Sequence, residues 1–217
     1  MGAIARNIAN NITTSGVFTS SAITNSSVTG ITVLANASDG ITLISSQTAS
    51  NSASLSFTTG IDSTYKAYKF VYVNCHPRTD AVSFRFNGST DGGSNYNVTK
   101  TSAKWGAYHD EADTANGNEL SPTGSLDQST VPQLLNSVGS IGNGSDESIS
   151  GELIIFNPSS TTYVKHYISR GNFYNDQDFS IDSYTVGYMN TTSAVNAIQF
   201  NMASGNFDGT IYLYGIK

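Results

Sequence analysis

The chain has 217 residues, of which 38% are hydrophobic and only 12% are charged. This length fits one large all-β domain, with or without an extra arm, in which Ser, Thr and Asn supply polarity in place of charge. The formal net charge is -6 and no basic run occurs, which argues against a nucleic-acid partner. No apolar run is long enough to cross a membrane, so we expect no membrane partner either. The single cysteine, Cys75, cannot form an intrachain disulfide and is expected to be a small buried residue.

The segment 1–36 differs from the rest of the chain. Isoleucines recur at spacing four near its start and would share one side of a short helix. A five-residue rhythm follows, which fits either one coil of a pentapeptide-like solenoid or an extended Ser/Thr-rich arm with apolar anchors. We favour the arm because the blocks are few, and we predict that it serves attachment or oligomerisation. Its expected contact residues are Ile4, Ile8, Ile12, Phe18, Ile23 and Val28.

The region 37–217 is predicted to be a jelly-roll-like antiparallel β-sandwich. Turn clusters such as Asn36-Ala-Ser-Asp-Gly40 separate short segments that are rich in β-branched and aromatic residues. About ten strands with short connectors favour a sandwich. In chain order, strands are predicted at 41–47, 54–58, 65–74, 82–86, 105–109, 151–156, 161–169, 179–188, 195–202 and 209–217.

Several loops are predicted between these strands. His76-Pro77 is expected to end the third strand, and Asn87-Gly88 and Asp91-Gly92-Gly93 are expected to form a loop. The segment 110–148 is read as an irregular insertion with a short helix near 131–138. An insertion of this length is a natural place for exposed function.

The last strand shows a clear period of two. Ile211, Leu213 and Gly215 fall on one face, and Tyr212, Tyr214 and Ile216 fall on the other. We expect the first face to meet the core of the sandwich. Tyr212 and Tyr214 are predicted to contact other subunits or the 110–148 insertion.

Segments at 61–65, 89–96, 156–163, 190–194 and 209–216 carry a family resemblance. Examples are Ser89-Thr-Asp-Gly-Gly-Ser-Asn-Tyr96 and Phe156-Asn-Pro-Ser-Ser-Thr-Thr-Tyr163. Together they resemble virion structural proteins of marine cyanophages and related tailed phages, which are often described as fibre-like. The resemblance covers roughly 30–217. It implies a non-enzymatic, repeated surface protein of a phage particle.

Motifs for catalysis or metal binding are weak. His109-Asp-Glu-Ala-Asp113 is the densest group of candidate ligands, but its spacing matches no Ca²⁺ loop, and we read it as a solvated acidic loop. His76, His109 and His166 lack the spacing of a zinc site. No Gly-x-Ser-x-Gly elbow occurs. We therefore expect no catalytic residue, no metal and no cofactor.

A sugar-binding surface is the main rival interpretation of the aromatic residues. Asn95, Tyr96, Trp105 and Tyr108 could form an aromatic and amide platform, since aromatic faces stack on the apolar side of sugar rings. The alternative is that Trp105 packs in the core or in a subunit interface.

The leading functional hypothesis is a capsid decoration or head-fibre protein, assembled in the bacterial cytoplasm and located on the virion surface. Residues 1–36 would dock on the major capsid protein or another virion protein, and 37–217 would face outward, as a homotrimer. The alternative is a tail fibre or knob that recognises host surface glycan. A polysaccharide depolymerase is a minor alternative.

Overall fold

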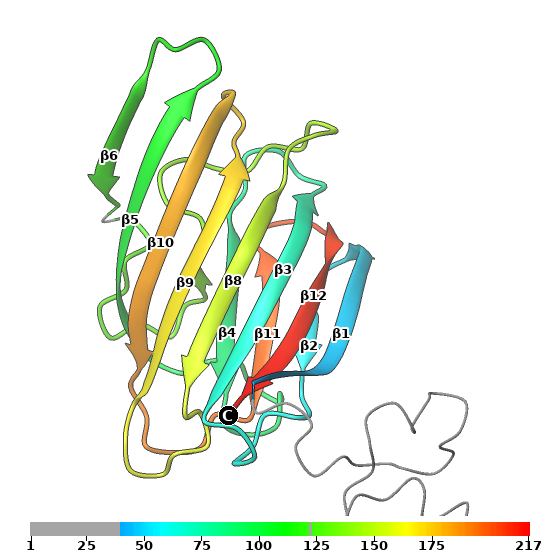
Figure 1. Cartoon of the computed structure of the whole chain (residues 1–217), viewed down its shortest axis with the longest axis vertical. Coiled ribbons are helices and arrows are strands. Elements are labelled where there is room, and N and C mark those ends of the chain that lie inside the picture. The colour runs from blue at the N-terminus through cyan, green and yellow to red at the C-terminus, as the bar shows by residue number, and fades with distance from the viewer. Residues whose placement is uncertain (1–39, 122) are drawn as a thin grey trace, which may run out of the picture. The chain divides into compact units, whose positions relative to one another are not determined.

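A computed structural model describes residues 40–121 and 123–217, which fold into two antiparallel β-sheets packed face to face (Figure 1). No helix occurs in these residues, so the predicted all-β, jelly-roll-like sandwich is confirmed. The arm residues Ile4, Ile8, Ile12, Phe18, Ile23 and Val28 lie outside the described residues. Within the described ranges, no helix is long and apolar enough to span a bilayer.

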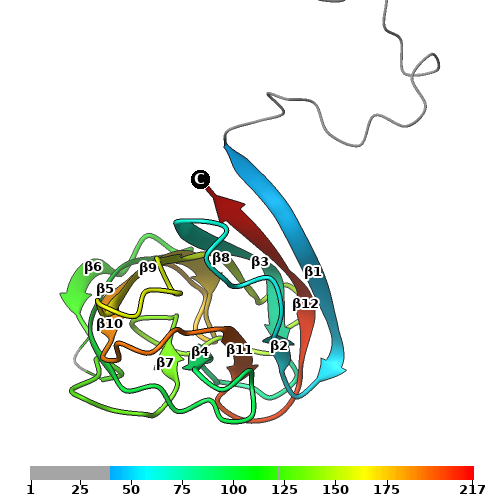
Figure 2. The same cartoon turned by 90° about the horizontal axis from the view of Figure 1, so that it is seen from below.

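The larger sheet has eight strands and the smaller has four. Seen from below, the larger sheet curves over the smaller one (Figure 2). In spatial order the larger sheet contains β1 (Ile41–Ser52), β12 (Phe207–Ile216), β3 (Ala67–Pro77), β8 (Ile149–Phe156), β9 (Lys165–Tyr174), β10 (Phe179–Met189), β5 (Lys100–Asp110) and β6 (Asn116–Leu120). The smaller sheet contains β2 (Leu55–Phe57), β11 (Ala197–Met202), β4 (Phe84–Ser89) and β7 (Gln133–Leu134).

The core between the sheets is dominated by aromatic rings. Phe200 of β11 stacks on Phe84 with ring centroids 5.8 Å apart, and it meets Phe70 of β3 at 5.3 Å. In the central strands β3, β9 and β10, alternate residues point into this layer, as the pleat requires. Because rings from both sheets interlock here, the core fixes how the two sheets pack.

The last strand, β12, follows its predicted pattern. Ile211, Leu213 and Gly215 are buried, whereas Tyr212 and Tyr214 are half-buried on the outer side. β12 pairs with β1 on one side and with β3 on the other. The strand is therefore an interior member of the larger sheet, and β1 forms the edge.

Two local predictions were wrong. Asn87-Gly88 is not a turn but part of β4, where the Asn87 amide donates to the carbonyl oxygens of Tyr96 and Thr130. The predicted helix at 131–138 is absent, because Gln133 and its neighbour pair with β4 and the chain there is extended. By contrast, His76-Pro77 forms the last two residues of β3, so the strand ends there as predicted.

The segment 110–148 is only partly irregular. It contributes β6 to one edge of the larger sheet and β7 to one edge of the smaller sheet. Trp105 belongs to β5, which is eleven residues long rather than a short strand. Cys75 is fully buried in β3, as predicted, and burial raises the pKa of its thiol to about 12.

Three buried lysines lie on the inner side of the larger sheet. Lys100 is fully buried, and its Nζ donates to Asn87 Oδ1 at 2.5 Å and to the Val98 carbonyl oxygen at 2.7 Å. Burial lowers the pKa of Lys100 to about 7 and that of Lys104 to about 8. Lys165 joins two loops through the carbonyl oxygens of Tyr163 and Thr191. No ion pair to a carboxylate involves these three lysines within the described residues.

Candidate functional site

The outer face of the larger sheet is the main exposed feature of the domain. The four-stranded sheet covers only its inner face (Figure 2). The strand register aligns the outward side chains in rows that run across the sheet. Because a β-sheet is rigid in register and pleat, such rows present fixed arrays of side chains to a partner.

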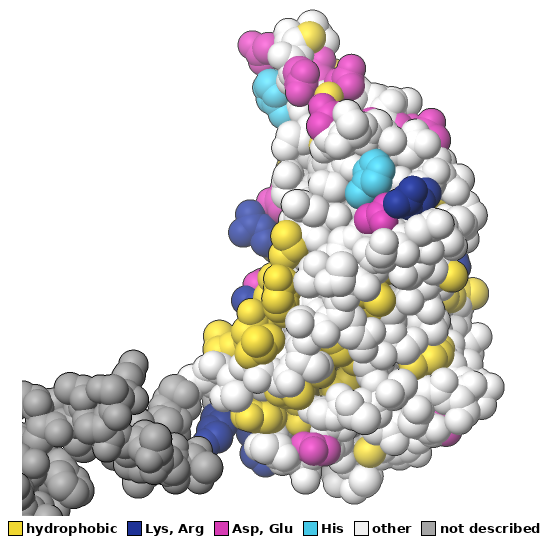
Figure 3. All heavy atoms as spheres, turned by 90° about the vertical axis from the view of Figure 1, so that its right-hand side faces the viewer, with side chains coloured by type: hydrophobic (Ala, Val, Ile, Leu, Met, Phe, Trp, Pro, Cys, Tyr) yellow, Lys and Arg dark blue, Asp and Glu magenta, His cyan; other side chains and the backbone are white. Residues whose placement is uncertain are grey.

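An apolar patch occupies the part of this face that includes the β1 edge. Ile41 and Leu43 are 56% and 54% exposed, although both are large aliphatic side chains. Viewed from the β1 edge, hydrophobic side chains gather in a strip on one side of the domain (Figure 3). The outward residues of this apolar patch are Ile41, Leu43, Ile154, Phe156, Ile168, Val186, Tyr212, Tyr214 and Ile216.

Tyr212 and Tyr214 sit inside the apolar patch. Their ring centroids are 6.4 Å apart, and their register partners on β3 are Val71 and Lys69. Lys69 is the one cation in the cross-strand row that contains Tyr214, and it pairs with Glu152 of β8. Five strands separate β12 from β6, so the two tyrosines do not meet the part of 110–148 that joins this sheet. A contact with another subunit remains the prediction for both side chains.

A second region of the outer face carries aromatic and charged groups. Trp105 of β5 is 37% exposed, so it is not part of the core. It lies beside Tyr184 of β10, with ring centroids 5.3 Å apart and an interplanar angle of 52°. β9 and β5 flank β10 on opposite sides. The guanidinium of Arg170 on β9 lies over the Tyr184 ring, 5.0 Å from its centroid. We call Trp105, Tyr184, Arg170 and Asp182 the aromatic platform.

Asp182 fixes Arg170 in this position. Its carboxylate accepts from Nε of Arg170 at 3.1 Å and from Nη2 at 2.9 Å. This bidentate pair holds the guanidinium plane, whereas a single contact would leave it free to rotate. Hydrogen bonding to Asp182 also raises the pKa of Arg170, so the group stays cationic.

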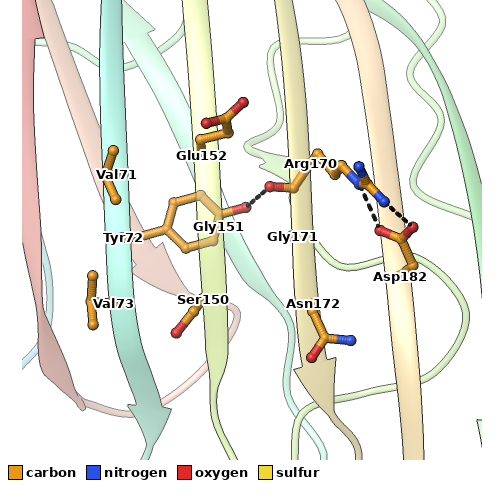
Figure 4. Close-up of a pocket in the computed structure, with 10 residues that line it drawn as sticks. All are labelled: Val71, Tyr72, Val73, Ser150, Gly151, Glu152, Arg170, Gly171, Asn172 and Asp182. Carbon is orange, nitrogen blue, oxygen red and sulfur yellow. Dashed lines mark hydrogen bonds and ion pairs between the residues drawn. The ribbon is translucent and has the colours of Figure 1, made fainter.

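A shallow groove of about 720 Å³ adjoins the aromatic platform. Its outward side chains come from β3, β8, β9 and β10 and include Ser150, Glu152 and Asn172 (Figure 4). Asn172 donates its amide N–H groups to the Ser180 hydroxyl and the Ile181 carbonyl. Its Oδ1 accepts no hydrogen bond from the described residues. The groove thus combines a hydroxyl, a carboxylate and an amide oxygen with the neighbouring guanidinium.

The backbone under the groove is held tightly from inside the sandwich. A Cβ at Gly151 would lie 2.4 Å from the Arg170 carbonyl oxygen, and the hydroxyl of the buried Tyr72 occupies the remaining space. Tyr72 donates to this same carbonyl oxygen at 3.4 Å, as Figure 4 shows. Because Gly151 and Gly171 have no side chains, β8 and β9 can pass directly over the Tyr72 ring. This ring in turn supports β9, the strand that carries Arg170.

The structure does not bring the four predicted sugar-contact residues together. Trp105 points outward from β5, whereas Tyr108 points inward and packs edge-on against Phe179 at 5.7 Å. Asn95 and Tyr96 lie in the loop after β4 of the other sheet. The Asn95 amide is engaged there by Asp91, whose pKa falls to about 2 through hydrogen bonds from Ser89 and Asn95.

Sequence reasoning missed the residues that do surround Trp105. Tyr184 and Arg170 are far from it in the chain, and only the register of β5, β10 and β9 aligns the three. The sequence predicts a strand at 179–188, but it does not show which strands lie beside it.

The acidic group from His109 to Asp113 starts in the last two residues of β5 and is largely exposed to solvent. His109 contacts Asp113 at 3.2 Å, and both side chains are exposed. Asp110 accepts hydrogen bonds from Thr114 and Ala115, which lower its pKa. No cluster of three or more His, Cys, Asp or Glu side chains able to hold a metal ion occurs within 40–121 and 123–217.

Comparison with protein-family models and with curated proteins gives no match for this chain. The similarity to phage virion proteins stays an expectation from the segments quoted above. The outer face of the larger sheet is accordingly the basis for inferring function.

Proposed function

We propose that the chain is a non-enzymatic structural protein of a tailed-phage virion, a capsid decoration or head-fibre subunit. Residues 1–36 dock on the major capsid protein or another virion protein, and the β-sandwich is displayed outward as a homotrimer. The observation that carries this proposal is the apolar patch on the outer face of the larger sheet.

The apolar patch favours assembly for a physical reason. Single exposed aliphatic residues are common, but contiguous patches on an otherwise polar surface mark protein interfaces. Leu43, Tyr214, Ile154, Ile168 and Val186 belong to one row across the sheet. The same row contains only one charged residue, and that residue is already paired with a carboxylate. A neighbouring subunit would therefore bury this row with little desolvation of charge.

The position of the apolar patch also fits an attachment arm. Ile41 and Leu43 open β1, which follows the predicted arm, 1–36, closely in the chain. Isoleucines at spacing four in 1–36 favour a parallel three-stranded association. An oligomer joined by the arms would bring the β1 strands close together, and their apolar side chains could then meet.

Two variants test the assembly. Replacing Tyr212 and Tyr214 with Ser should weaken the trimer, so that it dissociates at higher protein concentration than wild type in sedimentation velocity, while the circular dichroism melt stays close to wild type. Val131→Ser, at an exposed residue before β7, is the control and should leave the trimer intact. Loss of folding in the double variant, or an unchanged trimer, would contradict the assignment of this face.

Immunogold electron microscopy of purified particles tests the location. Labels over the capsid support the proposal, and labels on the tail support a tail fibre or knob instead. Deleting residues 2–30 should leave a folded domain that no longer joins the particle. Normal incorporation of the deletion variant would refute docking through the arm, and unlabelled particles would refute the virion role.

A further inference from the structure

We propose that the aromatic platform and its adjoining groove bind a neutral hexose-containing glycan. This inference goes beyond the proposed structural role and does not depend on it. It assigns ligand binding to Trp105, Tyr184, Arg170 and Asp182, together with Asn172 and Glu152 of the groove.

Trp105 supplies the apolar contact. A six-membered sugar has a face of C–H groups, and this face stacks on exposed aromatic rings that stay rigid in water. Trp105 and Tyr184 are adjacent across the β5–β10 register, and their centroids are 5.3 Å apart. The Tyr184 ring is half-buried between Trp105 and the Arg170 guanidinium, so it holds Trp105 in position, and the exposed Trp105 ring supplies the stacking face for a sugar.

The charged pair supplies orientation. Arg170 uses Nε and Nη2 for Asp182, and its Nη1 has no hydrogen-bond acceptor among the described residues. This N–H group is held in place by the ion pair and by the Tyr184 ring, so it can donate to a sugar hydroxyl without losing conformational freedom on binding. Asn172 Oδ1 and the Glu152 carboxylate are acceptors in the same groove.

The charge balance selects the class of sugar. Asp182 neutralises Arg170, and Glu152 is paired with Lys69, so the groove has no unpaired cation from these four residues. An acidic sugar would bring a carboxylate close to Glu152 and Asp182, and the free N–H group there belongs to a guanidinium whose charge Asp182 already neutralises. A neutral hexose needs only hydrogen bonds, and the groove supplies both donor and acceptors for these.

Trp105 provides an intrinsic fluorescence signal for binding at this site. It is the only tryptophan in the chain, so the intrinsic tryptophan emission of the full-length protein comes from this site alone. We would titrate the protein with cellohexaose, maltohexaose and mannohexaose, and with a galacturonate hexasaccharide as the acidic comparison. A neutral hexasaccharide should shift or quench the emission at micromolar to millimolar concentration, and calorimetry should give the same affinity.

Variants locate the binding. Tyr184→Ala keeps the fluorescence signal of Trp105 and should weaken binding by about tenfold, because Trp105 and Arg170 both lose the ring that holds them in position. Trp105→Ala, followed by calorimetry, should weaken it at least as much. Tyr163→Ala removes an exposed tyrosine outside the platform and should bind like wild type. All three variants should keep the wild-type oligomeric state, which separates this site from the apolar patch.

Three results would overturn the proposal. One is the absence of an emission change and of binding heat with all the neutral hexasaccharides. Another is undiminished binding by both Trp105→Ala and Tyr184→Ala. Tighter binding of the galacturonate hexasaccharide than of any neutral one would refute the assigned sugar class. None of these results bears on attachment to a particle.

Discussion

Replacing Lys100 with Met should remove a large part of the pH dependence of folding stability. Lys100 is fully buried, and neutral oxygens alone accept its hydrogen bonds. Burial disfavours the charged ammonium and lowers the pKa of Lys100 from 10.5 to about 7. In the unfolded chain the side chain keeps its ordinary pKa. Between these two values the unfolded state binds more protons, so stability must rise with pH across this window.

The size of this pH effect follows from the shift in the pKa of Lys100. Each pKa unit corresponds to about 1.4 kcal/mol, so the rise from pH 7 to pH 8.5 has a ceiling of about 2 kcal/mol. Asn87 Oδ1 and the Val98 carbonyl stabilise the ammonium, which reduces this ceiling, and we expect a contribution of about 1 kcal/mol. The measurements stop at pH 8.5. At higher pH the Cys75 thiol ionises in the unfolded state, which lowers the unfolding free energy and opposes its rise with pH.

The assay is urea denaturation at pH 7.0, 7.75 and 8.5, with the midpoint and slope fitted at each pH. The difference in unfolding free energy between wild type and Lys100→Met should grow in favour of wild type by about 1 kcal/mol over this range. Lys66→Met, at an exposed lysine, is the matched control and should follow wild type. If Lys100→Met shows the same pH slope as wild type, the buried ammonium is not the source of the effect.

Three further predictions concern the core and the platform. The Cys75 thiol should resist an aromatic disulfide reagent in the native protein and react only at the rate of unfolding, because it is buried and its pKa is raised to about 12; rapid labelling of native protein would contradict this. Gly151→Ala should lower the unfolding free energy by about 1–3 kcal/mol in urea, since its Cβ would meet the Arg170 carbonyl, and wild-type stability would show that β8 and β9 can separate. Asp182→Ala should change stability by less than about 1 kcal/mol, as expected for an exposed ion pair, yet weaken glycan binding; a large drop in melting temperature would make the pair structural.

Local alternation predicts the faces of single strands well in this chain. The period of two at 211–216 correctly separates Leu213, which is buried, from Tyr214, which faces outward. The all-β class follows from the same signal repeated along the chain. Such patterns succeed because the two environments of a strand, core and solvent, impose opposite demands on neighbouring residues.

Local signals fail where tertiary contacts override them. Asn87-Gly88 has the composition of a tight turn, but Lys100, Tyr96 and Thr130 satisfy the Asn87 side chain inside β4. Apolar spacing at 131–138 is compatible with a helix, yet hydrogen bonds to β4 extend this segment. Both cases need partners that are distant in sequence.

The candidate site depends even more on distant pairing. Trp105 was singled out from the sequence, but its true neighbours, Tyr184 and Arg170, become adjacent only through the order β9-β10-β5. Tyr108 was grouped with Trp105 because of proximity in the chain. An offset of three residues places two side chains on opposite faces of a strand, so this grouping fails once both residues belong to β5.

The pairing of β1 with β12 has a consequence for how assembly is timed during synthesis. Ile41 pairs with Ile216, and Leu43 pairs with Tyr214. β1 can therefore join the larger sheet only after β12 has been synthesised. Contacts this distant in sequence form slowly, since the loop between them must close first. The apolar patch draws residues from both strands, and it is complete only after this closure. A chain that is still emerging from the ribosome therefore lacks the finished interface, and premature association of nascent copies through it is disfavoured.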